Sequence, residues 1–335
     1  MITVLVPTFN RSKLLASMLA SLKWQILPTD RFEVLVVDNG STDETASVVK
    51  ALSSLVDNMR YLVEHEPGLH SARHRGLREA QGEIVVFADD DIEPMATWLL
   101  AIEQAFALPE TAMVGGNILP IFIGTPPTWL YELWRRENPD SSYSLSCLSI
   151  QEQSEGRREL NPYMVWGCNF AIRKDVLLAA GGFHPDGMPQ ELIRFRGDGE
   201  THVSKFVADN NLKCIFDSRS SVYHKITPER MTLGYFHKRG FNQGVSDSYT
   251  RLRNQPQAFS NNEPYNILEL LSIVKKILRA SKSRSFGRFS LAKQSLNLGE
   301  SALQEGYQEG FAYHQAVYAK DPDVRAWVHK ENYFQ

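Results

Sequence analysis

The segment Ile2-Thr3-Val4-Leu5-Val6-Pro7-Thr8-Phe9-Asn10-Arg11 opens this 335-residue chain with an apolar run that ends in a polar turn. Three more runs of this kind follow, over residues 33–37, 59–63 and 83–87, and segments with helical spacing separate them. Continuous Val, Ile and Leu runs are typical of parallel strands that are buried on both faces. The order predicts a β-α-β-α-β-α-β unit, and hence an α/β fold with a doubly wound, mostly parallel sheet.

Helices are expected between these strands. Apolar residues recur at helical spacing over residues 14–22, and Asn10 is the expected N-cap of that helix. Ser41-Thr42-Asp43-Glu44 resembles a capping box that begins a second helix. A third helix is expected over residues 71–80, before Gly82.

The rest of the chain has a less regular pattern. Residues 124–158 contain Pro126-Pro127 and are expected to form an irregular loop or lid. Strands are predicted over residues 113–119, 164–166, 213–216 and 221–224, the last two as a pair. Helices are predicted over residues 96–107, 175–180, 200–209, 228–253, 264–280 and 291–317.

The composition excludes several classes of protein. The formal net charge is −3, so no strong field favours a nucleic-acid partner. The three cysteines, Cys147, Cys168 and Cys214, are widely spaced, which argues against a disulfide framework and fits a reducing, cytoplasmic compartment. No apolar stretch is long enough for a spanning helix, and the first apolar run is too short for a signal peptide.

Polar residues follow the predicted strands. They are the segments at residues 7–11, 38–41, 64–66 and 88–91. Ligands of doubly wound sheets bind beyond the carboxyl ends of the strands. This acidic, polar rim around an apolar sheet therefore predicts a binding site.

The run Asp89-Asp90-Asp91 is the sharpest feature of this rim. Adjacent carboxylates repel one another unless a cation is present. Mg2+ prefers oxygen ligands and commonly takes one or two protein carboxylates together with substrate phosphates. Taken alone, the residue types leave open a second reading, in which an acidic turn favours the start of the next helix.

The segments at residues 4–11, 36–43 and 87–91 resemble glycosyltransferase family 2, which has the Rossmann-like GT-A fold, in their wording, order and intervals. Ser71-Ala72-Arg73-His74-Arg75-Gly76 is similar to an Ala-Arg-Asn stretch of the family, although His74 replaces the usual Asn. The likeness continues through Gly181-Gly182-Phe183, Gly197–Glu200 and Val222-Tyr223-His224. It implies a nucleotide-sugar-binding catalytic domain over residues 1–225 and a helical C-terminal region over residues 226–335.

The resemblance implies donor-binding roles. Asp38 would accept a hydrogen bond from the nucleotide base. The alternative reading is that Asp38 is an acidic residue at the start of a helix. Arg73 would face the diphosphate, where its fork of donors matches phosphate oxygens, unless it is a solvated helix-face arginine. The other implied contacts to the nucleotide sugar are Pro7, Thr8, Asn10, Arg11, Asp89 and Asp90.

The resemblance also implies a metal site for Mn2+ or Mg2+. Asp89 and Asp91 would be ligands, and Asp91 would be the firmest. His224 would be a further ligand, although a lone histidine at a strand end is otherwise structural. An imidazole among oxygen ligands favours Mn2+ over Mg2+.

The base and the acceptor side follow from the same likeness. The family carries a Glu-Asp pair before a helix, whereas this chain has Gly197-Asp198-Gly199-Glu200. Counting back from His224 makes Glu200 the expected base and Asp198 its competitor. Gly167, Cys168 and Asn169 would line the acceptor side, and Trp166 would stack on a sugar or pack in the core.

The implied activity is an inverting, non-processive transfer from a nucleotide sugar, with UDP-sugar favoured, in polysaccharide or glycoconjugate biosynthesis. The Gln-x-x-Arg-Trp signature of processive synthases is absent, and Arg239 lies in the similar region. A sugar-phosphate nucleotidyltransferase and a dinucleotide oxidoreductase both lack support, because no glycine-rich loop follows the first strand. A catalytically silent sugar- or nucleotide-binding protein stays open, because Gly197–Glu200 is unusual.

The acceptor is expected to be a carbohydrate, a lipid-linked intermediate or a peptide. Residues 267–278 form an amphipathic pattern with Lys275, Lys276 and Arg279 close by. Trp129, Tyr131 and Trp134 form an aromatic cluster. Either could contact the inner face of a cytoplasmic membrane, and core packing or a homodimer face is the other reading.

Overall fold

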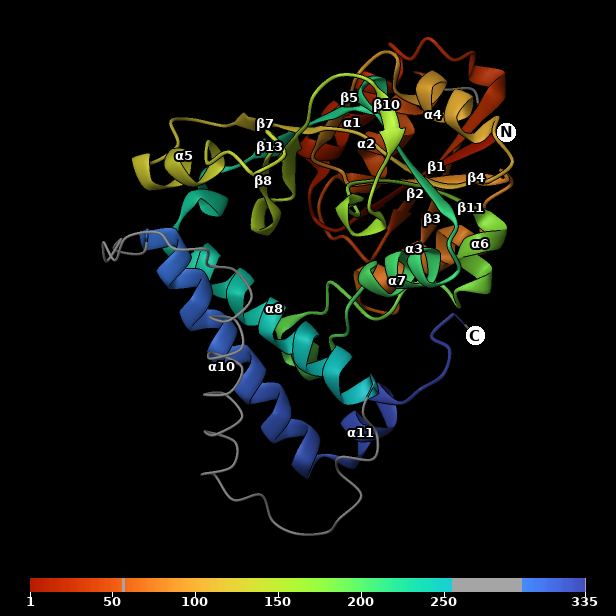
Figure 1. Cartoon of the computed structure of the whole chain (residues 1–335). Helices are drawn as coiled ribbons and strands as arrows, with labels where there is room; N and C mark the ends of the chain where they lie inside the picture. Colours follow the sequence, from red (N-terminus) through yellow and green to blue (C-terminus); the bar gives the residue numbers. More distant parts are fainter. Residues whose placement is uncertain (56–57, 255–296, 335) are drawn as a thin grey trace.

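The structure is a computed structural model that describes residues 1–55, 58–254 and 297–334. Its α/β part contains two sheets, and three C-terminal helices lie against it (Figure 1). The eight-stranded sheet has the order β10 (Arg157–Glu159), β12 (Lys213–Asp217), β6 (Thr111–Gly115), β11 (Asn169–Arg173), β4 (Ile84–Ala88), β1 (Ile2–Thr8), β2 (Phe32–Asp38), β3 (Met59–Val63).

Strands β1 to β4 confirm the predicted parallel unit. They pair in parallel with one another, and Thr8 at the end of β1 lies opposite Asp38 at the end of β2. Alternate residues of β1 point to opposite faces, where Val4 and Leu5 enter two different apolar clusters. Both faces are covered, so each buried Val or Leu side chain contributes roughly 1.5–3 kcal/mol of hydrophobic stabilisation.

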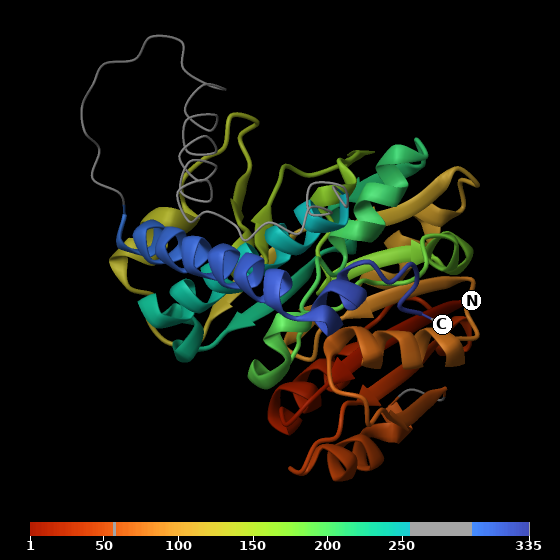
Figure 2. The same ribbon diagram turned by 90° about the horizontal axis from the view of Figure 1, so that it is seen from below.

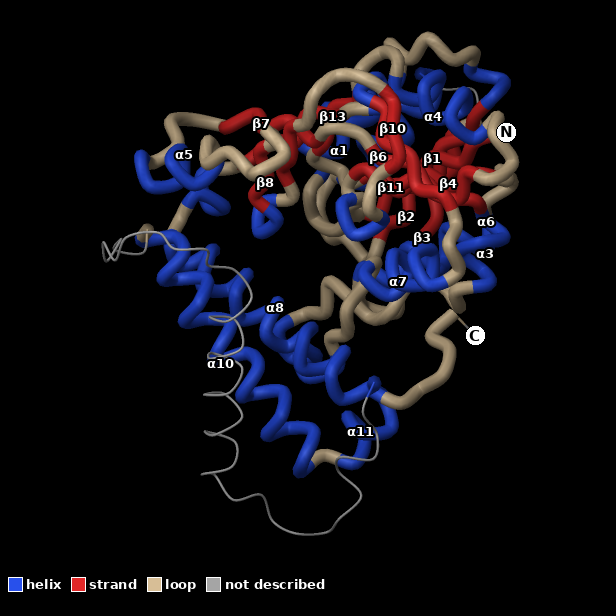
Figure 3. The backbone as a smooth tube through the Cα atoms, in the orientation of Figure 1, coloured by secondary structure: helices blue, strands red, loops and turns tan. Residues whose placement is uncertain are grey.

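Helices cover both faces of this sheet (Figure 3). One face packs against α1 (Ser12–Leu22), α2 (Thr45–Leu52) and α4 (Trp98–Phe106). The other packs against α3 (Leu69–Glu79), α6 (Lys174–Ala179) and α7 (Thr201–Asp209). This is the predicted doubly wound arrangement, and it includes two antiparallel strands, β11 between β4 and β6 and β10 beside β12.

Both predicted helix caps were wrong. Asn10 has a φ of 53° and its side-chain oxygen accepts the amide of Thr42, so it links two turns and does not cap α1. Helix α2 begins at Thr45, whose amide donates to the carboxylate of Asp43. Asp43 also accepts the amide of Ser12, so one carboxylate holds the starts of both helices.

The predicted strand over residues 113–119 is two strands in two sheets. The chain leaves the large sheet after Gly115 and continues as β7 (Ile118–Phe122). Gly116 lies between them, and a Cβ there would come closer than 3.0 Å to the backbone of Ser220. Likewise β12 and the strand after it, predicted as a pair, lie in different sheets, and residues 162–164 form a 3₁₀ turn in place of the expected strand at 164–166.

The second sheet has the order β5 (Ile92–Pro94), β13 (Val222–Ile226), β7, β9 (Ile150–Glu152), β8 (Tyr143–Leu145). Residues 124–158 were expected to be irregular, yet they contain α5 (Thr128–Trp134), β8, β9 and β10. These strands have three residues each, such as Arg157-Arg158-Glu159, and therefore show no apolar alternation. Pairing with distant strands, not local sequence, forms them.

The C-terminal region contains α8 (Leu233–Asn254), α10 (Leu298–Lys320) and α11 (Pro322–Val328). Helices α8 and α10 run side by side (Figures 1 and 2). Their backbones touch at two pairs of glycines spaced four residues apart, Gly240 with Gly244 and Gly306 with Gly310. A Cβ at any of these positions would come closer than 3.0 Å to a carbonyl oxygen of the facing helix.

The remaining predictions for this region have mixed outcomes. The helix expected at 264–280, with its basic amphipathic face, lies outside the described residues. Trp129 packs edge-to-face on Phe236 and Trp134 is buried, which fits core packing, whereas Tyr131 is exposed. No helix within the described ranges is both long and apolar enough to cross a bilayer.

The end of the chain returns to the α/β part (Figure 2). The ring of Phe334 packs edge-to-face on His74, and its carbonyl oxygen accepts a hydrogen bond from Arg78 of α3. Tyr333 is buried and accepts a hydrogen bond from the hydroxyl of Tyr249 in α8. The division into domains at residue 225 stays a prediction.

Candidate active site

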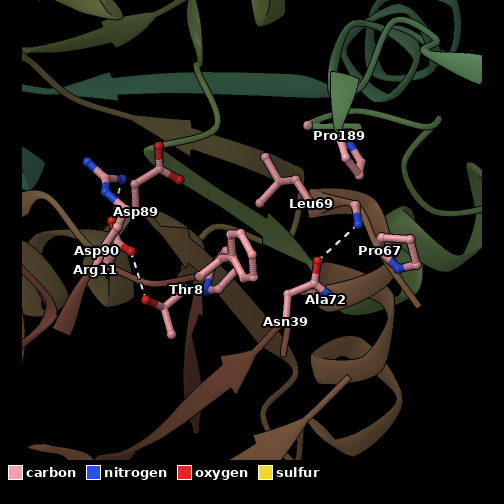
Figure 4. A pocket seen from close by; sticks show the side chains of 13 residues that line it. Thr8, Arg11, Asn39, Pro67, Leu69, Ala72, Asp89, Asp90 and Pro189 are labelled. Carbon is pink, nitrogen blue, oxygen red and sulfur yellow. Dashed lines mark hydrogen bonds and ion pairs between the residues drawn. The ribbon is translucent and has the colours of Figure 1, made fainter. Parts of the chain in front are cut away.

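A cavity of about 410 Å3 lies at the carboxyl ends of the parallel strands, and we call it the strand-end pocket. The turns after β1, β2 and β4 and the start of α3 contribute to its lining. Figure 4 shows Thr8, Arg11, Asp89 and Asp90 on one side of it, and Asn39, Pro67, Leu69 and Pro189 on the other. The sheet thus brings together rim residues that are up to eighty positions apart in the sequence, as expected for parallel strands.

Two arginines hold the acidic run after β4. Asp90 accepts hydrogen bonds from Thr8 at 2.8 Å and from Arg11 at 2.6 Å. Asp91 accepts from Arg11 at 2.6 Å and from Arg230 at 2.9 Å, both at Oδ2. Burial raises the pKa of Asp90 to about 7, although Arg11 opposes this shift. Arg11 and Arg230 therefore offset the charge repulsion at Asp90 and Asp91.

Asp91 and His224 form a pair that suits a divalent cation. His224 lies on β13 opposite Ile92 of β5, and this pairing brings its Nε2 to 3.2 Å from Asp91 Oδ1. Both side chains are buried, and within the described residues Asp91 Oδ1 has no hydrogen-bond partner. Burial raises the pKa of Asp91, but His224, Arg11 and Arg230 outweigh it and hold that pKa below its ordinary value.

The protein alone supplies an incomplete ligand set. In the part of the chain that the structure describes, no cluster of three His, Cys, Asp or Glu side chains could hold a metal. Asp89 is about one-third exposed and faces Arg73 at 3.9 Å. An unpaired buried carboxylate oxygen beside an imidazole still fits a cation whose other ligands come from phosphates and water.

Arg73 lies next to Asp89. Its side chain is buried and packs over the rings of Phe183 and Phe87, at 5.0 and 5.8 Å. Its guanidinium is 3.9 Å from Asp89 and 3.5 Å from Glu200, and it donates to the carbonyl of Gly167. Arg73 therefore lies within 4 Å of both Asp89 and Glu200. Its expected contact to the diphosphate stays a prediction.

Glu200 and Asp198 have very different surroundings. Glu200 precedes α7, accepts only the amide of Gly167 at 3.2 Å and the longer contact from Arg73, and is partly exposed. Asp198 is buried and uses both oxygens, one toward His184 at 2.6 Å and one toward Thr250 at 2.7 Å. His184 lowers the pKa of Asp198 against the opposing effect of burial. Glu200 is therefore more exposed than Asp198 and is held by longer contacts.

Four other predicted residues are not part of the lining of the strand-end pocket. Asp38 is buried, and its oxygens accept the amide of Ser41 and the hydroxyl of Tyr61. Asn169 is buried between the indole of Trp98 and the carbonyl of Ser220. Cys168 is also buried, and burial raises the pKa of its thiol. The indole of Trp166 donates to Tyr163 and its ring packs against the core.

A family model for glycosyl transferase family 2 matches residues 3–179, more than half of the chain. This chain belongs to that family. Glycosyltransferase AglE of Haloferax volcanii is 33% identical over 118 residues, which are 35% of this chain and 39% of AglE. The matched part is thus well under two thirds of that relative's length.

Solved structures in the family share the fold. The mannosyltransferase PcManGT from Pyrobaculum calidifontis, in complex with GDP-Man and Mn2+, is 22% identical, with a TM-score of 0.52 over 98% of this chain and 82% of that one. TarS residues 1–349 from S. aureus, in complex with UDP-GlcNAc, is 19% identical, with a TM-score of 0.50 over 98% of this chain and 90% of that one. These likenesses confirm the predicted fold.

Arg230 belongs to this site although no motif pointed to it. Arg230 follows β13 and donates to Asp91 and to Tyr235, with its Nη1 3.0 Å from His224 Nε2. An arginine six residues after the predicted metal-ligand histidine was the available signal. Arg239 lines a second cavity, whose lining also includes Glu200.

Proposed function

We propose that this family 2 chain transfers one sugar per cycle from a nucleoside diphosphate sugar to an acceptor hydroxyl, with inversion at the anomeric carbon. The observation that carries the proposal is the buried Asp91–His224 pair, in which Asp91 Oδ1 faces the imidazole without a hydrogen bond, beside Asp89 and Asp90, which line the strand-end pocket. The pocket, at about 410 Å3, has the size range of small-molecule sites.

The nucleotide would lie in the strand-end pocket, in contact with Pro7, Thr8 and Arg11, and Asp38 would receive the base. We favour a uridine nucleotide, because TarS has been solved with UDP-GlcNAc. Guanosine is the alternative to be tested, because PcManGT has been solved with GDP-Man. Residues 1–225 would form the donor-binding catalytic domain, and residues 226–335 would complete the acceptor side.

Asp89, Asp91 and His224 would hold Mn2+ or Mg2+. When bound, the ion would neutralise the departing diphosphate. The PcManGT complex with Mn2+ supports a divalent ion in this family. Arg230 would keep the Asp91 carboxylate oriented, because it donates to one oxygen and leaves the other unpaired.

Glu200 would remove the proton from the acceptor hydroxyl. Its side chain is partly exposed and held by contacts of 3.2 and 3.5 Å, whereas Asp198 is buried with both oxygens in hydrogen bonds of 2.6 and 2.7 Å. Arg73 and the amide of Gly167 hold Glu200 in place. A cytoplasmic location at the inner face of a membrane fits this reaction but rests on the cysteine content.

Binding of UDP and GDP, each with and without Mn2+, tests the proposal on wild type and Asp91→Asn. We expect the nucleotide to raise the melting temperature of wild type more with Mn2+ than without it. Asp91→Asn should lose that Mn2+ increment and at least about 100-fold in transfer or donor hydrolysis, since the ion contributes several kcal/mol.

Asp30→Asn is the matched control, because Asp30 lies at the exposed start of a 3₁₀ turn away from the pocket. It should behave as wild type. Unchanged Mn2+ dependence in Asp91→Asn, or the absence of donor hydrolysis in wild type with every nucleotide sugar, would overturn the proposal and favour a silent binding protein.

A further inference from the structure

A second cavity, of about 370 Å3, lies between Glu200 and helix α8. The strand-end pocket includes Gly187 and this cavity includes Asp186, so the two meet at one loop. Side chains of α8 line it, among them Arg239, Ser246, Thr250 and Arg251. We call it the α8 cavity. On the proposed function it is the place for the acceptor, because it contains the carboxylate of the proposed base.

The carboxylates of the α8 cavity are each matched by a partner. Asp186 pairs with Arg196 at 2.6 Å. Asp198 is held by His184 and Thr250, and Glu200 by Arg73. The remaining carboxylate, Asp247 on α8, accepts hydrogen bonds from Gln243 and Tyr307, and burial raises its pKa. Arg239 helps to lower the pKa of Asp186, yet none of these carboxylates accepts a hydrogen bond from Arg239 or Arg251.

Two guanidinium groups in the same cavity have no such match. Neither Arg239 nor Arg251 makes an ion pair or a side-chain hydrogen bond with any residue that the structure describes. Arg239 is partly buried, and its Nε is fully buried without an acceptor. A buried donor without a partner costs free energy, and a ligand that supplies the acceptor removes that cost.

Guanidinium groups bind phosphates and carboxylates through parallel charge-assisted hydrogen bonds. The lining named for this cavity includes no aromatic side chain, so a sugar ring would find no stacking partner there. The cavity thus combines two guanidinium groups that lack hydrogen-bonded acceptors with polar side chains, and it contains the proposed base. That combination fits an acceptor that carries an anionic group close to its accepting hydroxyl.

We propose that the α8 cavity binds an anionic acceptor, and that Arg239 and Arg251 bind its phosphate or carboxylate group. This inference rests on the proposed function and adds the class of acceptor to it. Arg239 therefore serves the acceptor and not the donor diphosphate, since it lines the α8 cavity and the strand-end pocket does not include it.

The test measures binding of small anionic probes to the full-length protein saturated with Mn2+ and the nucleoside diphosphate that it binds. Glycerol 3-phosphate and glucuronate are titrated by calorimetry, with glycerol and glucose as their uncharged counterparts. Filling the strand-end pocket first prevents a probe from binding there. We expect the charged probes to bind and the uncharged ones not to, and the stronger of the two charged probes identifies phosphate or carboxylate.

Arg239→Gln and Arg251→Gln should each weaken probe binding by roughly 10-fold or more, the value of a charge-assisted hydrogen bond. Lys238→Gln removes the same charge from an exposed neighbouring position on α8 and should leave binding unchanged. All three variants should bind the nucleotide with Mn2+ as wild type does, which also shows that they fold.

Two results would overturn the inference while leaving the proposed function intact: equal binding of charged and uncharged probes, or probe binding that Arg239→Gln and Arg251→Gln do not change. Weaker nucleotide binding in Arg239→Gln, with probe binding unaffected, would return this arginine to the donor side. Failure of the proposed function would appear separately, as the absence of nucleotide binding in wild type.

Discussion

The strand-end pocket and the α8 cavity lie side by side but are built in opposite ways. The first collects residues from the ends of consecutive parallel strands, such as Thr8, Asn39 and Asp89. The second combines the segment before α7 with one face of α8, some fifty positions later. Strand ends place side chains by local pairing rules, whereas the position of a helix depends on everything that packs against it.

The difference has a functional consequence. The strand-end pocket has a rigid frame, because β1, β2 and β4 are hydrogen-bonded and buried on both faces. The α8 cavity depends on the glycine contacts between α8 and α10, and on Tyr333 at the chain end. Donor binding should therefore survive changes that destroy the acceptor side.

Glu200→Gln should show the largest difference between the two regions, because it affects catalysis and leaves donor binding unchanged. It should lower kcat by about 100- to 10,000-fold through loss of general-base catalysis, with nucleotide and Mn2+ binding unchanged. Steady-state kinetics together with nucleotide titration measure both quantities. An active Glu200→Gln enzyme beside an inactive but stable Asp198→Asn enzyme would reverse our choice of base.

The control for that experiment is Asp198→Asn. It removes the charge that His184 and Thr250 face in a buried network. We expect it to lower the free energy of unfolding by about 1–3 kcal/mol, as for a broken buried charged hydrogen bond. Urea unfolding measures this loss.

Gly306→Ala tests whether the α8–α10 contact holds the α8 cavity together. An added Cβ would press on the backbone of His237, and such overpacking typically costs about 1–3 kcal/mol, against a gain of about 1 kcal/mol in helix propensity. Urea unfolding should show net destabilisation. Anionic probes should bind more weakly, while nucleotide binding should be retained.

Gly234→Ala is the matched control for this prediction. It lies in α8 with open space around its Cβ, so it should be neutral or slightly stabilising. If Gly306→Ala matched Gly234→Ala in stability and in probe binding, the close helix contact would not be what maintains the cavity.

The smallest effect that we expect is a loss of stability in mild acid. Burial lowers the pKa of His70, His74 and His314 to about 4, about 3 and about 4. The unfolded chain therefore binds more protons between the ordinary value of 6.5 and these low values, so stability falls as the pH falls through that window. Near pH 5.5 each histidine should account for about 1 kcal/mol.

Urea unfolding at about pH 7.5 and 5.5 measures this dependence, with His314→Gln as the comparison. His314 lies on α10 and its Nδ1 is 2.8 Å from the hydroxyl of Ser248 on α8, so its share of the loss belongs to the helical region. The variant should be less stable at neutral pH but lose about 1 kcal/mol less on acidification. An unchanged acid dependence would contradict our account of His314.

Much of the fold could be predicted because the parallel unit is local. Each of the strands β1 to β4 shows its burial in its own apolar run, and the residue after each run is placed by the sheet. The second sheet could not be predicted, because Tyr143-Ser144-Leu145 and Arg157-Arg158-Glu159 become strands only by pairing with distant partners. The helix caps failed because side chains from another turn, such as Asp43, satisfied the amides.

The sequence by itself determined that Asp89, Asp90 and Asp91 follow a buried parallel strand at the binding edge of a sheet. Only the tertiary structure decided that Asp91 meets His224 and Arg230, that Asp198 has shorter hydrogen bonds than Glu200, and that two arginines beside Glu200 have no hydrogen-bonded acceptor. The physical reason is that the apolar residues of a strand themselves indicate that it is buried, whereas the partner of a charged side chain depends on which distant segments fold against it.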